Sequence, residues 1–358
     1  MLVEKSPCMM LVLFWYILYF LFAAHIYFKL KSDSPKPTRK DSDSINVSVV
    51  IPFRNESNNL PDLLKCIKKL KSSHQITWLF VNDHSTDGSD QLIENENDLH
   101  LWHLPPASQG KKQALIFGLE KVRGDVIVCI DADVSFNEQW LDRLISPIIN
   151  KNSDWVIGAV DMKALQHSHL AIMQILEWKA LQRLTHYFAH FHKPILCNGA
   201  NLAFKTALKQ EAIQALNNQQ TSSGDDLSIM TRFNGLNAKA SYVTGDASVT
   251  TSVPADLKSF VQQKIRWSKK MTIQRNLTSV VGLWFLLSQI LLLVCCFTKS
   301  WNEILLIMGI KYFSDSLIIP EYQWRNAPYW LLLQIYPVIL YIIQPFVSLT
   351  WKGRSIKS

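Results

Sequence analysis

Hydrophobic and polar positions divide the chain into three parts of different character. Residues 6–28 carry no Asp, Glu, Lys or Arg, and a run of that length can cross a bilayer core of about 30 Å as a helix. In residues 45–253, short β-branched runs alternate with helical stretches. Residues 276–298 and 326–351 are again uncharged and apolar. The pattern predicts a water-soluble α/β domain between membrane helices.

The middle part predicts parallel strands joined by crossover helices. Its strand-like runs are apolar throughout, which is typical of a sheet covered on both faces. Ligands of such sheets gather beyond the carboxyl ends of the strands. The runs are VSVVIP, ITWLFVND, LHLWHLP, DVIVCIDAD and DWVIGAVD. The polar residues that end them, and that we expect to share one edge, are Asn55, Glu56, Asp83, Asp131 and Asp133.

These patterns predict four segments. We interpret residues 1–30 as a membrane anchor; the alternative is a cleaved signal peptide, but the apolar run is too long and no small-residue cleavage motif follows. Residues 31–44, rich in Ser, Pro and Lys, predict a solvated linker. Residues 45–275 form the predicted soluble domain, and 276–358 the C-terminal membrane region with two or three apolar helices and a basic tail.

One stretch of the C-terminal region is ambiguous. Residues 301–320 contain Glu303, Lys311 and Asp315. The stretch could lie in the membrane interface, or span the bilayer with Lys311 and Asp315 paired one helical turn apart. We favour the interface, because the basic tail WKGRSIKS then falls on the same side as the soluble domain.

Composition narrows the class of protein. The chain is 48% hydrophobic and 18% charged, which is too apolar for disorder and too charged for a chain embedded in the membrane throughout. Its net charge of +8 gathers near the apolar segments, which favours a membrane surface over nucleic acid as the partner. Six cysteines without a CxxC pair argue against disulfides and predict a reducing, cytoplasmic setting.

The clearest candidate for chemistry is the pair Asp131 and Asp133. The two carboxylates follow a buried strand at positions i and i+2, so they can point to the same side as the strand opens into a loop. Adjacent carboxylates are costly unless a positive group compensates, and a divalent cation with a diphosphate is a common solution. An Asp-x-Asp in a surface turn without function has the same sequence.

Six ordered motifs give this pair a context. They are VSVVIPFRNE at 47–56, VNDHSTDGS at 81–89, GKKQALIFG at 110–118, DAD at 131–133, GDD at 224–226 and QKIRW at 263–267. In order and spacing the chain resembles the membrane-bound family 2 glycosyltransferases across roughly residues 45–270. The resemblance implies a GT-A fold, which is a Rossmann-like mixed sheet flanked by helices, with transmembrane helices at both ends.

The resemblance also assigns donor-binding roles. Asp83 matches the acid that binds the nucleotide base, although it could instead cap the turn that follows. Pro52 and Glu56 match the loop that lines the nucleoside pocket. Lys111 matches a lysine near the donor phosphates; Lys112 is a rival for that role, and a solvated helix start is the plainer interpretation. Asn82 stands where relatives commonly have an acid, and Ile116 where many have Asn. For the aspartate pair, the resemblance places Asp133 on a Mg or Mn ion and Asp131 on the ribose or the metal shell.

The acceptor side follows in the same way. Asp226 matches the general base that takes a proton from the acceptor hydroxyl, and Asp225 precedes it. Alternatively, both acids only complement a helix N-terminus. Gln263, Arg266 and Trp267 match residues at the acceptor end of the donor site, with Arg266 near the diphosphate and Trp267 as a platform for a sugar; a basic aromatic turn before a membrane helix is also an ordinary interfacial anchor.

The resemblance implies inverting, metal-dependent transfer of a sugar from a nucleotide-diphosphate donor to a membrane-proximal acceptor, either a lipid-linked saccharide or a polysaccharide. The expected setting is a multi-pass cell-membrane protein with a cytoplasmic catalytic domain. Alternatives are a processive polysaccharide synthase, a nucleotidyltransferase, and a non-catalytic membrane protein that binds nucleotide sugars. The sugar, the base and the acceptor depend on pocket shape rather than on motifs.

Overall fold

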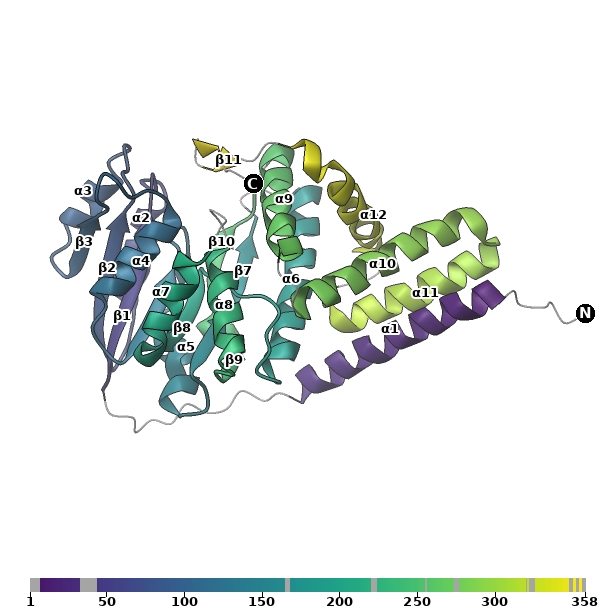
Figure 1. The fold of residues 1–358 in the computed structure, drawn as a ribbon, viewed down its shortest axis with the longest axis horizontal. Coiled ribbons are helices and arrows are strands. Elements are labelled where there is room, and N and C mark those ends of the chain that lie inside the picture. Colours follow the sequence, from purple (N-terminus) through teal and green to yellow (C-terminus); the bar gives the residue numbers. More distant parts are fainter. Residues whose placement is uncertain are drawn as a thin grey trace, which may run out of the picture. The chain divides into compact units, whose positions relative to one another are not determined.

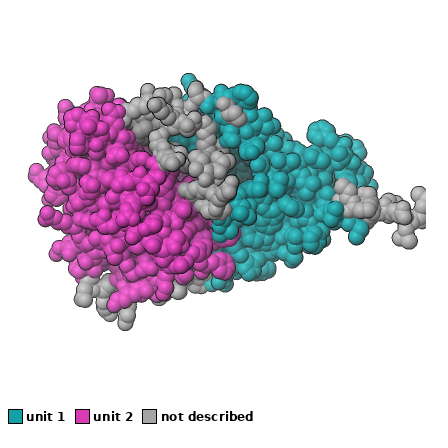
Figure 2. Space-filling view, in the orientation of Figure 1, with its two compact units in different colours: residues 1–35, 164–187, 254–356 teal, residues 36–163, 188–253, 357–358 magenta. Residues whose placement is uncertain are grey.

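The computed structural model forms two compact units, a helical unit and an α/β unit (Figures 1 and 2). The helical unit holds residues 1–35, 164–187 and 254–356, and the α/β unit holds 36–163, 188–253 and 357–358. The structure describes residues 7–32, 44–164, 168–219, 224–254, 256–273, 277–319, 321, 326–347, 350–351 and 354–355. The predicted linker 31–44 and the basic tail 352–358 fall largely outside the described residues. The predicted segment boundaries therefore stay predictions.

The α/β unit is built on a seven-stranded sheet in the order β3-β2-β1-β4-β8-β6-β9. Its strands are β1 (Asn46–Phe53), β2 (Gln75–Asn82), β3 (Leu99–His103), β4 (Val126–Ile130), β6 (Trp155–Gly158), β8 (Asn201–Lys205) and β9 (Ala240–Val243). Strands β1 to β4 pair in parallel. Their carboxyl ends therefore share one edge, as the sequence predicts, and this edge holds the predicted donor site.

Strand β8 gives the mixed sheet that the family resemblance implies, although the hydrophobic runs alone predicted only parallel strands. It pairs antiparallel with both β4 and β6, so the sheet is mixed. The hydrophobic pattern of the sequence predicts no strand over its residues, NLAFK. The run is short and follows the polar segment CNGA. Its pattern is therefore too weak to predict a strand, although β8 pairs with a neighbour on each side.

Helices cover both faces of this sheet. They are α2 (Leu60–Lys69), α3 (Ser89–Glu94), α4 (Lys111–Lys121), α5 (Trp140–Ile149), α7 (Lys209–Asn217) and α8 (Asp225–Gly235). Phe204 of β8 packs edge-to-face on Phe233 of α8, while Asn201 of the same strand accepts a hydrogen bond from Trp140 of α5. Residues 201 and 204 point to opposite faces of a strand, so α8 and α5 lie on opposite faces. Helix α4 packs so closely on β1 that a Cβ on Gly118 would lie 2.5 Å from Val50.

The run DWVIGAVD, predicted as one strand, forms two strands in different sheets. Strand β6 ends at Gly158, and β7 (Val160–Lys163) joins β5 (Ser135–Phe136) and β10 (Val249–Ser252) in a three-stranded sheet. The bend depends on Gly158, because a Cβ there would lie 2.1 Å from Nδ2 of Asn201. The small sheet follows Asp133 directly along the chain and supports the loop that carries it.

The described residues of the helical unit contain six long helices, labelled in Figure 1. They are α1 (Pro7–Lys31), α6 (His169–Ala189), α9 (Leu257–Ile273), α10 (Leu277–Thr298), α11 (Trp301–Ile318) and α12 (Ala327–Ile343). Within the described residues, α1 from Met9 and α10 are long and apolar enough to cross a membrane, and α12 is apolar but shorter. Helices α6 and α9 group here, although they fall inside the predicted 45–275 domain.

Candidate active site

The loop after β4 carries the predicted aspartate pair, and Lys111 is bound to it. Lys111 is the first residue of α4, and its Nζ lies 2.5 Å from Oδ1 of Asp131. Burial alone would lower the pKa of Lys111, but the charge of Asp131 and the more distant charges of Asp225 and Asp226 hold it above its ordinary value. The neighbouring Lys112 instead donates to the carbonyl oxygen of Gln219. Lys111 is therefore the lysine that faces the carboxylates.

Asp133 sits in strongly negative surroundings. Its carboxylate reaches the surface, and Oγ1 of Thr251, on β10, lies 3.5 Å from its Oδ2. Partial loss of water around the carboxylate, together with the negative charges of Asp131 and Glu56, raises the pKa of Asp133 to about 6 despite the opposing charge of Lys111. A bound cation would stabilise this carboxylate, because its positive charge would offset the negative charges around Asp133.

Asp131 and Asp133 fit a hard divalent cation if the substrate supplies further oxygen ligands. Within the described residues, no three His, Cys, Asp or Glu side chains come together as a metal site. Mg²⁺ commonly binds through one or two carboxylates plus substrate phosphate oxygens. Asp133 and its neighbour Asp131 match that requirement, and their oxygen ligands suit Mg or Mn better than zinc.

The predicted base lies at the start of α8. Gly224 adopts a left-handed conformation (φ 104°) and lets the chain turn into the helix, which begins at Asp225. Asp225 is buried, whereas Asp226 is half-buried and its Oδ1 accepts a hydrogen bond from the backbone N–H of Leu227 at 2.9 Å. A Cβ on Gly199 would lie 3.3 Å from Cβ of Asp226. The loop 197–200 therefore packs directly against the predicted base, and only a residue without a side chain leaves that space open.

The charged groups of these motifs lie close enough to act on one another. Lys111 responds to the charges of Asp131, Asp225 and Asp226, and Asp133 responds to those of Asp131 and Glu56. The structure therefore brings together six residues that sequence analysis selected from four separate motifs. They are Glu56, Lys111, Asp131, Asp133, Asp225 and Asp226.

The predicted nucleoside pocket lies at the ends of β1 and β2. The backbone N–H of Asp83 donates to the carbonyl oxygen of Phe53 at 2.9 Å, which fixes the buried Asp83 beside the end of β1. The N–H of Glu56 donates to Ser89 Oγ at 2.8 Å. Pro52 lies inside β1 and is buried, opposite Val81. These contacts place all three residues along one edge of the sheet.

Side chains other than Asp83 hold the turn that follows it. Oδ1 of Asn82 accepts from the N–H of Ser85 at 2.9 Å. Asp87 accepts from the N–H groups of Ser57 and Ser89. Slight burial would raise the pKa of Asp87, but these hydrogen bonds and that of the Ser89 hydroxyl lower it well below its ordinary value. Asn82 and Asp87 therefore cap the turn, which was the alternative role for Asp83.

The predicted acceptor residues Gln263, Arg266 and Trp267 lie on α9, in the helical unit. Trp267 packs against Trp178 of α6 with ring centroids 5.2 Å apart. Lys264 forms an ion pair with Glu177 and lies 4.5 Å from the centroid of the Trp267 ring. These contacts fix Trp267 between α6 and α9, and the roles of the three residues at the donor site stay predictions.

Two supporting residues escaped the sequence analysis. Thr251 contacts Asp133 from a strand 118 positions further along the chain. Asn201 is fully buried and joins β8 to the carbonyl oxygens of Ala159 and Ala247. Neither Thr nor Asn in a short strand is distinctive, so only the fold identifies their positions.

Comparison with known proteins gives a consistent result. Residues 48–210 match the family described as Glycosyl transferase family 2. An undecaprenyl-phosphate 4-deoxy-4-formamido-L-arabinose transferase of Pseudomonas fluorescens is 32% identical over 122 residues, covering 32% of this chain and 35% of that protein. This chain thus matches only about a third of that relative's length. A hyaluronan synthase of Streptococcus pyogenes is 22% identical over 351 residues, covering 87% of this chain and 81% of the synthase.

A solved structure supports the fold. The mannosyltransferase of Pyrobaculum calidifontis, determined in complex with GDP-Man and Mn²⁺, superposes with a TM-score of 0.60 at 17% identity. The superposition covers 94% of this chain and 96% of the other. At that identity the likeness establishes the architecture, a GT-A-type α/β domain with a central mixed sheet. Residues 48–210 of this chain therefore match the model of glycosyl transferase family 2, and the chain has the architecture of the GT-A fold.

Proposed function

We propose that the chain is an inverting glycosyltransferase that moves a sugar from a nucleotide-diphosphate donor to a membrane-proximal acceptor. The observation that carries the proposal is the charged cluster of Lys111, Asp131, Asp133 and Asp226, in which Lys111 is paired with Asp131 at 2.5 Å and feels the charge of Asp226. Such a cluster offers positive charge for a diphosphate, carboxylates for a cation, and a further carboxylate for a proton. These are the groups that the two halves of a sugar transfer require.

The donor binds at the ends of β1 and β2 and at the start of α4. Asp83 binds the nucleotide base, and Pro52 and Glu56 line the nucleoside pocket. Lys111 meets the donor phosphates from the N-terminus of α4, where backbone N–H groups add to its charge. Because Asp131 is paired with Lys111, it also orients the lysine for that role.

Asp133, with Asp131 beside it, would hold a Mg or Mn ion. When bound, such a cation neutralises charge on the departing nucleoside diphosphate. The mannosyltransferase structure contains Mn²⁺ together with GDP-Man, which supports a metal ion at the donor site here. Thr251, on β10, positions Asp133 through the 3.5 Å contact of its hydroxyl with the carboxylate.

Asp226 takes the proton from the acceptor hydroxyl. Its Oδ1 is held by the N–H of Leu227, which orients the carboxylate, and we assign the proton to Oδ2. A single base that acts opposite the leaving group produces inversion at the anomeric carbon in one displacement. Gln263, Arg266 and Trp267 complete the acceptor side, with Arg266 near the diphosphate and Trp267 under a sugar ring.

The acceptor is membrane-associated in this proposal. Two helices suit a bilayer by length and apolarity, and one relative is named for undecaprenyl phosphate, another for hyaluronan. A lipid-linked saccharide or a growing polysaccharide therefore fits. We propose a multi-pass protein of the cell membrane with its catalytic domain in the cytoplasm. Processive synthesis is a second candidate, favoured by the match to hyaluronan synthase along 87% of the chain.

A panel of nucleotide sugars tests the proposal. The purified protein is incubated with each donor and Mg²⁺ or Mn²⁺, and released nucleotides are identified. Release of a nucleoside diphosphate from one donor, lost on chelation of the metal, is the expected result. Release of pyrophosphate would instead indicate a nucleotidyltransferase, and binding without turnover in the presence of membrane extracts would indicate a non-catalytic protein.

A further inference from the structure

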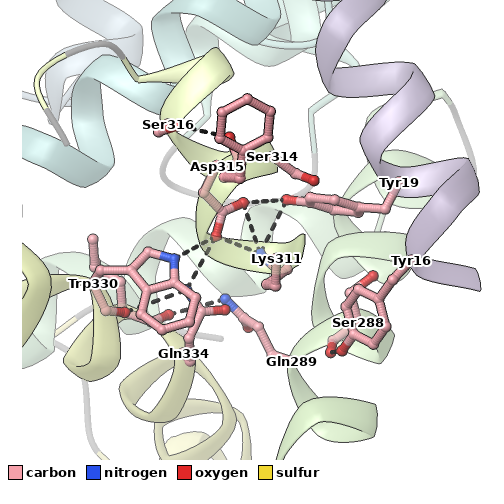
Figure 3. Close-up of polar contacts among 12 residues, drawn as sticks. Tyr16, Tyr19, Ser288, Gln289, Lys311, Ser314, Asp315, Ser316, Trp330 and Gln334 are labelled. Carbon is pink, nitrogen blue, oxygen red and sulfur yellow. Dashed lines mark hydrogen bonds and ion pairs between the residues drawn. The ribbon is translucent and has the colours of Figure 1, made fainter. Parts of the chain in front are cut away.

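A buried polar cluster around Asp315 ties three helices of the helical unit together (Figure 3). Lys311 Nζ lies 2.7 and 2.6 Å from the two carboxylate oxygens of Asp315, one turn away on α11. Tyr19 Oη, on α1, donates to Asp315 Oδ1 at 2.7 Å. Trp330 Nε1, on α12, donates to Oδ2 at 2.7 Å. The charges of Lys311 and Asp315 are thus neutralised by each other and satisfied by donors from neighbouring helices.

Helix α1 is also joined to α10, and the contacts give their relative direction. Trp15 Nε1 donates to Ser288 Oγ at 2.9 Å, whereas Tyr19, further along α1, packs on Trp284, which comes earlier on α10. The two helices are therefore antiparallel. Only residues 299 and 300 separate α10 from α11, so these two helices also run in opposite directions. Helices α1, α10 and α11 lie side by side (Figure 1).

Helix α6 shows which end of this bundle faces the catalytic side, meaning the side of the membrane that holds the α/β unit. The chain leaves the α/β unit before α6 and returns to it immediately afterwards, so α6 stays on the catalytic side. Tyr187 of α6 packs against His25, near the end of α1. Lys179 of α6 forms an ion pair at 2.8 Å with Glu321, three residues after α11 ends. The C-terminal ends of α1 and α11 therefore both lie on the catalytic side.

Helix α12 contacts helices of the catalytic side at its start and at its middle, and between these contacts its Leu333 carbonyl accepts a hydrogen bond from Gln289 of α10 at 3.0 Å. Tyr329 Oη lies 2.7 Å from Nδ1 of His169 on α6. Two turns later, Tyr336 packs against Phe260 of α9, with ring centroids 5.7 Å apart. Helix α9 follows the α/β unit directly and precedes the span α10, so it too lies on the catalytic side. A helix that crossed the bilayer would leave these two partners within its first turns.

We infer that α11, and not α12, returns the chain across the bilayer, given the membrane location proposed above. Eighteen residues of α11 extend about 27 Å, close to the bilayer core. Of its three charges, Glu303 caps the helix start through Ser300, and Lys311 and Asp315 neutralise each other. Exposed apolar side chains of α1, α10 and α11, such as Leu21, Leu287 and Leu305, then face lipid chains.

This assignment reverses the sequence-based preference for an interfacial 301–320 and a spanning 326–351. Both assignments leave the chain's basic tail on the catalytic side, so tail labelling does not separate them. They differ at the connection between α11 and α12. With α11 as the span, Glu321 lies on the catalytic side; with α12 as the span, it lies on the opposite side.

Single-cysteine labelling tests the assignment. Cys8, Cys66 and Cys296 are replaced by Ser in the full-length protein, and the buried Cys129, Cys197 and Cys295 are left in place. Three variants are then made on this background: Glu321→Cys at the connection, Lys299→Cys at the α10–α11 turn, and Lys65→Cys on the exposed surface of the α/β unit. Each is treated with a membrane-impermeant maleimide in right-side-out and inside-out vesicles.

We expect Glu321→Cys to label from the same side as Lys65→Cys, and Lys299→Cys only from the other side. Labelling of Glu321→Cys together with Lys299→Cys would overturn the assignment. Labelling of all three from one side would overturn it as well, because α10 and α11 would then not cross. Sidedness is independent of catalysis, so an inactive nucleotide-sugar panel would contradict the proposed function and leave this result unaffected.

Discussion

Asn201 gives the sharpest stability prediction, because one buried amide joins the two sheets of the α/β unit. Its Oδ1 accepts from Trp140 Nε1 at 3.1 Å. Its Nδ2 donates to the carbonyl oxygens of Ala159 at 2.9 Å and Ala247 at 2.8 Å. Ala159 lies at the bend between β6 and β7, and Ala247 lies just before β10. The amide therefore fixes the small sheet that supports Asp133.

Replacing Asn201 with Ala removes all three hydrogen bonds inside the protein. Each contributes about 1 kcal/mol net, and buried groups left without a partner cost about 1–3 kcal/mol each. The expected loss in free energy of unfolding is therefore about 3–5 kcal/mol. For a unit of this size, 1 kcal/mol corresponds to about 2–4 °C in Tm, so we expect the transition of the α/β unit to fall by at least about 6 °C.

Thermal unfolding in detergent, followed by near-ultraviolet circular dichroism, measures this loss in the full-length protein. Asn198→Ala is the matched control, since the Asn198 amide donates at 3.0 Å to a single backbone carbonyl, that of Gly158. The control should lose about 1 kcal/mol. The reasoning is refuted if Asn201→Ala melts within 2 °C of the wild type or no lower than Asn198→Ala.

Three further predictions concern the metal, pH and the membrane helices. Asp133→Ala should weaken donor binding mainly when Mg²⁺ or Mn²⁺ is present, as calorimetry would show; equal wild-type affinity with and without metal would contradict this. Partial burial would raise the pKa of Asp154, but hydrogen bonds from Lys205 and Lys239 lower it. Wild type should therefore be more stable than Asp154→Asn at pH 7, and this difference in free energy of unfolding should disappear below about pH 4. A difference that does not change with pH would contradict this. Lys311→Met should cost about 3–5 kcal/mol in detergent unfolding, and adding Asp315→Leu should restore most of it; no recovery would argue against a buried ion pair.

The sequence predicted the elements whose signal is local. The short, β-branched apolar run VIVCI before a polar turn favours a central strand, and all five of its residues are buried in β4. The start of α8 at Asp225 and that of α4 at Lys111 were also predicted correctly, because Gly before a polar helix start marks both positions. Site residues taken from separate motifs meet because parallel strands end at one edge.

What the sequence could not supply depends on contacts between distant residues. The antiparallel insertion of β8 is set by its pairing with β4 and β6, and no periodicity in five residues encodes it. The bend after Gly158 depends on the approach of Asn201. For α11, the three charges left its placement ambiguous and the side of the basic tail favoured the membrane interface. Nothing in the sequence indicates that Tyr19, nearly 300 residues away, contacts Asp315.

The kinetics of Asp226→Asn test the proposed mechanism most directly. Amide and carboxylate are nearly the same shape, so donor affinity, metal dependence and Tm should stay at wild-type values. Turnover should fall by about 10²–10⁴-fold, the range typical of general-base catalysis, while Asp225→Asn should cost less. Near wild-type turnover of Asp226→Asn would contradict the mechanism, and so would greater damage from Asp225→Asn with donor binding intact.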